Sequence, residues 1–90
     1  MAEDNIIYVG GKSFMNYVIS VLMQFNKGVS EVRIKARGKH ISRAVDIAEM
    51  VKNKFIKEAK VKTINISSEE FEGKDGKIRR VSVIEVILAK

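Results

Sequence analysis

The sequence predicts an α+β fold in which a single domain, residues 1–90, packs two helices on a small mixed sheet. Some segments have apolar residues at every second position, as in strands, and others have them at the spacing of a helical face. These segments follow one another in the order β-α-β-α-β-β. All six glycines fall between these periodic segments, where turns need them. Because 46% of the residues are hydrophobic, the chain has enough apolar side chains for one compact core.

The first strand and the first helix are predicted before residue 28. Asn5–Val9 is apolar and rich in β-branched residues, and a glycine pair ends it. Ser13–Asn26 has helical spacing, with a serine at the N-cap and Gly28 as its stop. We expect Phe14 and Tyr17 in the core rather than on a surface that stacks bases. The apolar stripe of this helix consists of Met15, Val18, Ile19, Leu22 and Phe25.

A second strand and a second helix follow. Glu31–Arg37 alternates strictly between apolar and charged residues, which is the pattern of a half-buried strand. Its basic residues Arg33, Lys35 and Arg37 therefore face away from the core. Helical spacing returns over Ile41–Ile56.

The last two strands are predicted to form a hairpin. Alternation resumes over Val61–Ser67, and the long apolar segment Ile78–Leu88 suits a central strand. Between them, Glu69–Lys77 contains the turn signal Asp75-Gly76. Because the tip has little apolar surface to bury, we expect this hairpin to protrude from the domain.

The composition argues against several classes of protein. Cysteine is absent and His40 is the single histidine, so we expect no disulfide, no metal site and no cofactor. We expect His40 to be a turn or cap residue and the protein not to be an enzyme, because no base, nucleophile and orienting group stand together. No apolar run approaches the ~20 residues that span a bilayer, and the N-terminus lacks the basic flank of a signal peptide. We therefore expect a cytoplasmic protein without a membrane partner.

The charge distribution points to polyanionic partners. The net charge is +6, and five basic residues stand against one acid between Glu31 and Arg43. A high charge content also suits solubility at high temperature. The connections after the first two strands are expected at one end of the sheet. One face would then present the cations Lys12, Arg37, Lys39 and Arg43.

The segment Gly10-Gly11-Lys12-Ser13 leads into the first helix. Paired glycines let backbone N–H groups approach an anion, and the helix N-terminus adds a favourable dipole. Lys12 supplies charge, and Asn16 offers hydrogen bonds. The glycine spacing of a nucleotide-hydrolysing Walker loop is missing, so contact with nucleic-acid phosphates is the better interpretation.

The hairpin adds a second group of cations. From Glu69 to Arg80 the acidic and basic residues cancel, so the tip as a whole is not an electrostatic anchor. The stem carries Arg79 and Arg80. A projecting arm with paired arginines can enter a minor groove, where the negative potential favours guanidinium groups.

Two long segments carry a family resemblance. Residues 9–18 read Val-Gly-Gly-Lys-Ser-Phe-Met-Asn-Tyr-Val, and residues 28–39 read Gly-Val-Ser-Glu-Val-Arg-Ile-Lys-Ala-Arg-Gly-Lys. They resemble the Alba family of small archaeal chromatin and RNA-binding proteins, and the resemblance extends over nearly the whole chain. It implies a βαβαββ fold, a homodimer, and sequence-independent coating of double-stranded DNA in the nucleoid, together with RNA binding.

The resemblance also implies roles for particular residues. Phe55 matches an aromatic residue at which neighbouring dimers meet side by side on DNA. Many members carry two adjacent lysines after the first glycine, and acetylation of the first lowers DNA affinity. Gly11 stands at that position here, so acetylation, with its lysine acetylase and deacetylase, would have to move to Lys12. The implied nucleic-acid contacts are Lys12, Asn16, Arg37, Lys39, Arg43, Arg79 and Arg80.

Two alternatives stay open. An RNA-specific ribonucleoprotein subunit, or a stabiliser of folded RNA, would have the same basic loops. A protein whose charge serves solubility alone would bind polyanions equally well after loss of Lys12, Arg37 and Lys39.

Overall fold

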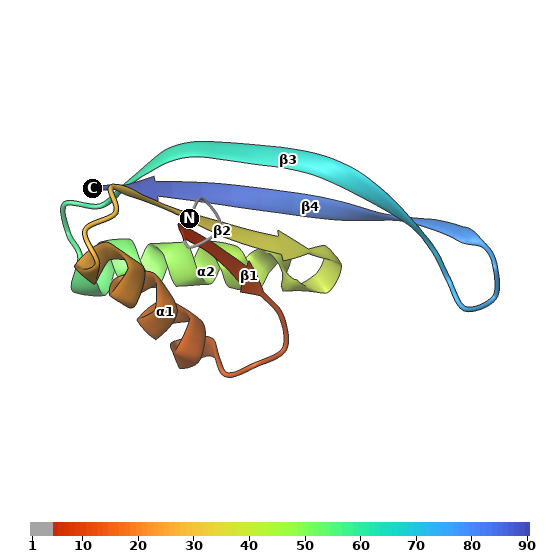
Figure 1. Ribbon diagram of the computed structural model, residues 1–90, viewed down its shortest axis with the longest axis horizontal. Helices are drawn as coiled ribbons and strands as arrows, with labels where there is room; N and C mark the ends of the chain where they lie inside the picture. Colours follow the sequence, from red (N-terminus) through yellow and green to blue (C-terminus); the bar gives the residue numbers. More distant parts are fainter. Residues whose placement is uncertain (1–4) are drawn as a thin grey trace.

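The computed structural model describes residues 5–90 and contains one four-stranded sheet with two helices. The strand order is β1-β2-β4-β3, with β1 parallel to β2 and the other neighbours antiparallel. Both helices lie on the same side of the sheet (Figure 1). The predicted α+β fold with a mixed sheet is therefore confirmed. The elements are β1 (Ile6–Val9), α1 (Phe14–Asn26), β2 (Glu31–Arg37), α2 (Ile41–Met50), β3 (Lys60–Glu72) and β4 (Ile78–Ala89).

The core lies between the helices and the two central strands. Val32 and Ile34 of β2 are fully buried, whereas the charged residues between them face the open side of the sheet, as the alternation predicted. Leu88 of β4 is also fully buried. The apolar run of β4 reflects burial on both faces of the sheet, because the adjacent residues Val86 and Ile87, which point to opposite faces, are both buried.

The buried face of α1 differs from the predicted one. Tyr17, Val18, Val21 and Phe25 are buried, as expected for the two aromatic residues among them, and Phe14 packs against the core. Met15 and Ile19 of the predicted stripe are exposed instead, and Met23 beside them is exposed as well. Apolar residues surround most of this helix, so its periodicity alone could not define which row faces the sheet.

The second helix is interrupted near its end. The α-helix ends at Met50, and a π-helical turn, Val51–Phe55, replaces the α-helical turns predicted up to Ile56. The Ile56 N–H donates to the Val51 carbonyl over 2.8 Å, which is the i→i+5 bond of such a turn. Val51 is buried, whereas Phe55 is half exposed.

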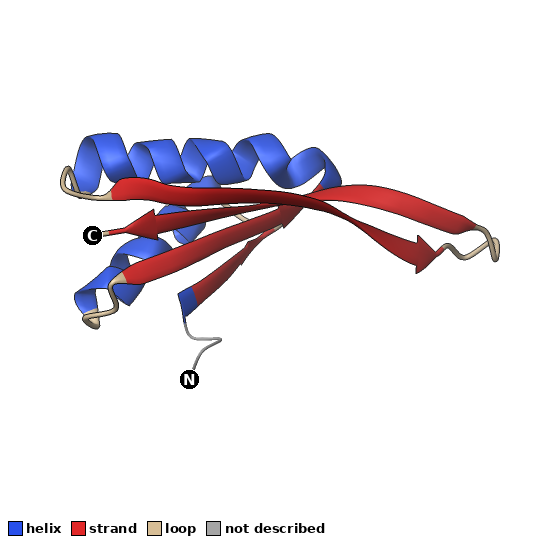
Figure 2. Ribbon diagram, turned by 90° about the horizontal axis from the view of Figure 1, so that it is seen from above, coloured by secondary structure: helices blue, strands red, loops and turns tan. Residues whose placement is uncertain are grey.

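The hairpin is longer than predicted. β3 continues to Glu72 instead of ending at Ser67, and the turn is confined to residues 73–77. Cross-strand backbone pairing from Ser68 to Glu72 extends the ladder without burying apolar side chains. The hairpin projects beyond the helices, as expected, and gives the molecule extents of 45 × 24 × 20 Å (Figure 2).

Gly38, in the short 3₁₀ turn that precedes α2, is a position where only glycine fits. Its φ is +54°, and an added Cβ would lie 3.1 Å from Cγ2 of Val81. Gly38→Ala should therefore lower the free energy of unfolding by about 1–2 kcal/mol, measured by urea titration. Gly11→Ala is the control, because Gly11 has open space around it. Equal stability of the two variants would contradict this assignment.

Candidate nucleic-acid interface

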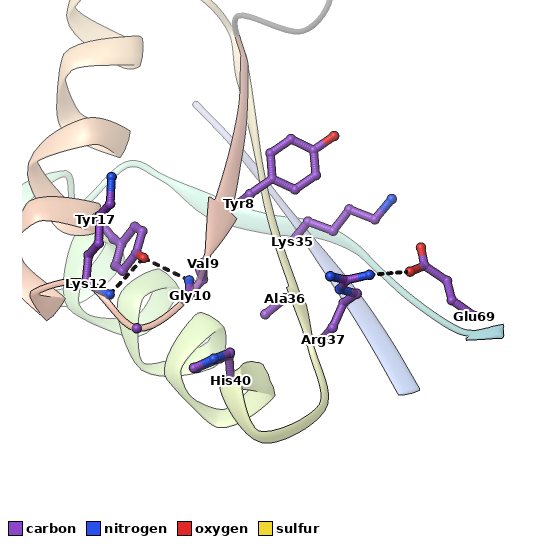
Figure 3. Close-up of a pocket in the computed structure, with 11 residues that line it drawn as sticks. Tyr8, Val9, Gly10, Lys12, Tyr17, Lys35, Ala36, Arg37, His40 and Glu69 are labelled. Carbon is purple, nitrogen blue, oxygen red and sulfur yellow. Dashed lines mark hydrogen bonds and ion pairs between the residues drawn. The ribbon is translucent and has the colours of Figure 1, made fainter. Parts of the chain in front are cut away.

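The loops that follow β1 and β2 meet at one end of the sheet. Because these strands are parallel neighbours, their carboxyl ends lie side by side. The Arg43 Nη1 donates to the Lys12 carbonyl over 2.6 Å, which joins the start of α2 to the first loop. Arg37 and Lys12 line the same hollow of about 730 Å³ (Figure 3). Lys39 is exposed in the turn between Arg37 and Arg43, so the loop cations share one end of the molecule.

The first loop is held from inside the protein. The Tyr17 hydroxyl accepts hydrogen bonds from the backbone N–H groups of Gly10, at 2.9 Å, and Lys12, at 3.2 Å (Figure 3). We expected these N–H groups to approach an anion directly, and that expectation is wrong for these two. A buried tyrosine hydroxyl needs a polar partner, and the loop backbone supplies it. The exposed Lys12 side chain stays accessible to an anion.

The start of α1 keeps its polar side chains exposed. Ser13 occupies the N-cap position, but its side chain makes no capping hydrogen bond. Asn16 is exposed one turn into the helix, and its backbone N–H donates to the Ser13 carbonyl over 3.1 Å. The side chains of Lys12, Ser13 and Asn16 are thus accessible on the same short segment.

Three of the four arginines of the candidate interface, all except Arg43, are paired with acids from the hairpin. Arg37 Nη1 lies 3.2 Å from Glu69 Oε1. Arg80 Nη2 lies 2.7 Å from Glu70 Oε2, so the hairpin stem holds a similar pair. Exposed pairs of this kind are each worth only ~0–1 kcal/mol, so a phosphate can displace the carboxylate at little cost.

The lysines differ from the arginines in this respect. Lys12, Lys35 and Lys39 form no ion pair with another residue in the range 5–90. Lys12 and Lys39 are also exposed. The loop end of the sheet therefore presents positive charge that no described carboxylate neutralises.

The hairpin arginines form a separate group. Arg79 pairs with Asp75 across the turn at 2.7 Å, and Arg80 follows it on β4. Adjacent strand residues point to opposite faces, so the two guanidinium groups lie on different sides of the arm. The sequence-predicted residues thus fall into a loop group and an arm group, and Glu69 at the base of the arm contacts the loop group through Arg37.

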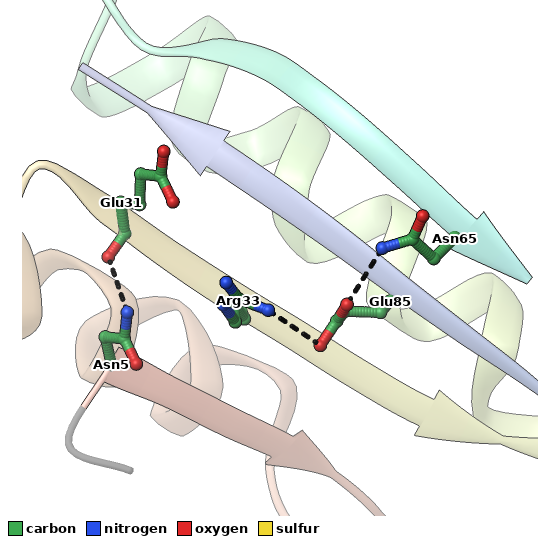
Figure 4. Close-up of polar contacts among 5 residues, drawn as sticks. All are labelled: Asn5, Glu31, Arg33, Asn65 and Glu85. Carbon is green, nitrogen blue, oxygen red and sulfur yellow. Dashed lines mark hydrogen bonds and ion pairs between the residues drawn. The ribbon is translucent and has the colours of Figure 1, made fainter. Parts of the chain in front are cut away.

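The opposite end of the open sheet face is electrically balanced. Arg33 lies 3.6 Å from Glu85, which also accepts a hydrogen bond from Asn65 (Figure 4). Lys62 donates to the Glu31 carboxylate, and this hydrogen bond lowers the pKa of Glu31 despite partial desolvation. Arg33 and Lys62 at this end of the open sheet face are therefore each paired with a carboxylate.

Most residues of the hollow were not among the predicted site residues, and the polar ones include Tyr8, Lys35 and His40. Tyr8 occupies the outward position of β1 and is 67% exposed. The alternation of β1 could have revealed it, because Tyr8 is the only large polar side chain in Ile6–Val9. His40 lies at the N-cap position of α2, as expected for a cap residue.

The chain is therefore a small α+β protein with a four-stranded sheet and helices on one face. Basic residues gather at the loops that follow β1 and β2, and the β3-β4 hairpin projects as an arm. The chain belongs to the Alba family, whose model matches residues 5–68. It is 54% identical over 88 residues to the DNA/RNA-binding protein Alba of Methanococcus maripaludis, covering 97% of this chain and 99% of the relative. It is also 54% identical over 90 residues to DNA/RNA-binding protein Alba 1 of Archaeoglobus fulgidus, covering 100% of this chain and 99% of that relative.

A solved structure has the same fold. Alba from Thermoplasma volcanium superposes with a TM-score of 0.90 at 48% identity, covering 96% of this chain and 100% of that chain. Across residues 5–90, no helix is long and apolar enough to cross a membrane. No group of three or more His, Asp or Glu side chains in that range could hold a metal ion.

Proposed function

We propose that this protein binds double-stranded DNA and RNA through their phosphates, without sequence preference, and coats DNA as a nucleoid protein. The observation that carries the proposal is the gathering of Lys12 and Lys39, which are exposed and form no ion pair with any carboxylate of residues 5–90, at the same end of the sheet as Arg37 and Arg43. Relatives at 54% identity are named DNA/RNA-binding proteins. Lysine and arginine side chains on loops suit backbone neutralisation, which carries no sequence information.

The arm contributes a second contact region. Arg79 and Arg80 lie at the start of β4, next to the turn that ends the projecting hairpin. If backbone phosphates replaced the carboxylates of Asp75 and Glu70 as their ion-pair partners, these arginines could lie along a minor groove. Asn16, exposed beside Lys12, supplies a neutral hydrogen bond to a phosphate oxygen.

We infer a homodimer from an apolar surface beside α2. Ile64 and Ile66 of β3 lie on the helix side of the sheet, because Ile64 is in register with Val86, and Val86 with buried Ile34. They are nevertheless 55% and 80% exposed. Ile66 lines a hollow of about 410 Å³ with Ile41, the first residue of α2.

A second copy of this chain fits this apolar surface. Val45 is one helical turn beyond Ile41 and is also exposed, so the surface extends along α2. The isoleucines and valine carry no charge, which suits the core of an obligate homodimer interface. A dimer would present two loop groups and two arms to a single duplex.

The proposal is tested by fluorescence anisotropy on one DNA duplex and one RNA duplex of equal length, titrated with salt. Phosphate-driven coating predicts steep and similar salt slopes with little change when the sequence is scrambled. Tight RNA binding that survives salt, with weak DNA binding, would instead indicate an RNA-specific protein. Absence of binding to both at low salt would leave a basic protein whose charge serves solubility.

Gly11 gives a direct way to raise the affinity. An added Cβ at Gly11 meets nothing within 4 Å, so a lysine fits there beside Lys12. Gly11→Lys should steepen the logarithmic salt slope on duplex DNA by about 0.9 per protomer, read from the same titration. Gly11→Gln is the control of similar length, and an equal effect from glutamine would rule out charge as the cause.

Lys12 is the proposed position for regulation by acetylation. Its ammonium is exposed, and its backbone N–H and carbonyl are bonded within the protein. Acetylation removes the charge and would therefore weaken phosphate binding without disturbing the loop. A lysine acetylase and a deacetylase are the partners this proposal requires.

Phe55 is proposed to join neighbouring dimers on DNA. It is 49% exposed, and the π turn that carries it contacts α1, whose Met15, Ile19 and Met23 form an exposed apolar row. Phe55→Ala should leave the dimer intact but reduce the cooperativity of coating, measured by binding to duplexes of increasing length. Phe71→Ala, at an exposed aromatic on the arm, is the control. Unchanged cooperativity in Phe55→Ala would remove this residue from that role.

A further inference from the structure

Tyr8 is a large aromatic side chain that the fold does not use. It lies on β1, the edge strand of the sheet, and is 67% exposed. Its ring is not part of the core cluster, whereas its neighbour Val9 is. A ring of this size left in water on a strand is available for a contact with another molecule.

The surroundings of Tyr8 are basic. Lys35 is its register partner on β2, and Arg37 follows two residues further, about 6.6 Å along the strand. Figure 3 shows Tyr8, Lys35 and Arg37 extending from the same side of β1 and β2. Among residues 5–90, Glu69 is the single acid that lines this hollow, and it is paired with Arg37 at 3.2 Å.

The hollow beside the ring has room for a nucleotide. Its volume is about 730 Å³, within the ~300–1,000 Å³ range of ligand sites. Gly10 and Gly11 form part of its lining, and an added Cβ at Gly11 would meet nothing within 4 Å. Lys12 and His40 contribute polar groups at its margin.

We propose that this hollow binds an unpaired nucleotide of a single-stranded nucleic acid, with the base stacked on Tyr8 and the flanking phosphates held by Lys35 and Arg37. This inference rests on the proposed nucleic-acid binding and adds a second mode to it. In a duplex the faces of the bases are covered by their neighbours, so an aromatic ring can stack only on a base that is unpaired or splayed out. Aromatic stacking combined with a cationic groove is the usual basis for binding single strands without sequence preference.

The site is continuous with the duplex-binding loops and shares Arg37 with them, but Tyr8 and Lys35 belong to the single-strand site alone. Tyr8 and Lys35 are register partners on β1 and β2, and all three side chains line the same hollow. A single strand leaving a duplex held by the loops would therefore pass directly over Tyr8. Loss of the Tyr8 ring should affect single strands and leave duplex binding in place.

The test compares Tyr8→Ala and Tyr8→Phe with the unchanged protein, using fluorescence anisotropy at one salt concentration. The probes are an oligouridylate and an oligodeoxythymidylate of about 12 nucleotides, and a DNA duplex of the same length. Tyr8→Ala should weaken single-strand binding by about 5- to 100-fold and change duplex binding by less than about 2-fold. Tyr8→Phe should retain single-strand binding, because the ring and not the hydroxyl carries the contact.

Two controls keep the test interpretable. Phe71→Ala removes another exposed aromatic side chain, one that lies outside the hollow, and should leave binding to these short strands unchanged. Tyr8→Trp introduces the single tryptophan of a chain that has none, and stacking should quench its fluorescence when oligouridylate is added. Thermal unfolding of each variant verifies the fold.

The outcomes separate this inference from the function on which it rests. Equal single-strand affinity of Tyr8→Ala and the unchanged protein would overturn the stacking site while leaving the duplex function intact. If Tyr8→Ala lowered the affinity for single strands and for duplex DNA by the same factor, the stacking site would be overturned as well, because loss of a stacking contact should weaken single-strand binding selectively. Failure of the unchanged protein to bind any probe would remove the proposed function itself.

Discussion

Replacing Lys12, Arg37 and Lys39 together by alanine should lower the affinity for a DNA duplex by about 100-fold in moderate salt. All three side chains lie at the same end of the sheet and are proposed to bind phosphates, and a charge-assisted contact is worth ~1–3 kcal/mol. The logarithmic salt slope should fall in magnitude by about 2.7 per protomer. Anisotropy titrations at several salt concentrations measure both quantities.

A matched variant separates position from net charge. Lys54, Lys57 and Lys60 follow α2 and are exposed, whereas the loop cations precede it. Their replacement by alanine removes the same charge from the other end of the helix. Equal loss of affinity in the two triple variants would mean that the protein binds polyanions through its overall charge, with no defined interface.

The second large effect is expected at Ile66. Ile66→Lys would place an ammonium group in the apolar surface shared with Ile41 and Ile64, and an unpaired buried charge is not tolerated in such an interface. The protein should then sediment as a monomer of 10.1 kDa instead of at twice that mass. Duplex affinity should fall with it, because each monomer retains half of the contacts.

Ile78→Lys provides the comparison for this prediction. Ile78 is also a highly exposed isoleucine, but it lies at the start of β4 on the arm, far from α2. This variant should remain dimeric. A dimeric Ile66→Lys protein would place the subunit contact elsewhere on the molecule.

Much of the fold could be predicted because local patterns and tertiary packing agree. The alternation of Glu31–Arg37 matches a strand covered by helices on one face only, and the apolar run of β4 matches its central place. The extent of β3 could not be predicted, because its outer half is held by cross-strand backbone bonds that impose no apolar pattern. The π turn after Met50 also has no signal in the spacing of apolar residues.

The candidate site divides in the same way. The two basic loops lie together because β1 and β2 are parallel neighbours whose carboxyl ends lie at the same end of the sheet. The order of the predicted strands and the basic residues after them were therefore enough to predict this arrangement. The pairing of Arg37 with Glu69 joins residues 32 positions apart and depends on where the hairpin crosses the sheet. The bonds from the loop backbone to Tyr17 depend on the orientation of α1, which the sequence left undefined.

The anchoring of the first loop affects how the protein would respond to temperature. The N–H of Lys12 is bonded to Tyr17, and its carbonyl to Arg43, so the backbone around the ammonium is ordered before any ligand arrives. The binding free energy then contains little unfavourable chain entropy. Its main favourable contribution is the release of counterions into solution. Because the loop does not have to become ordered on binding, the affinity of the protein for a polyanion would depend far more on ionic strength than on temperature.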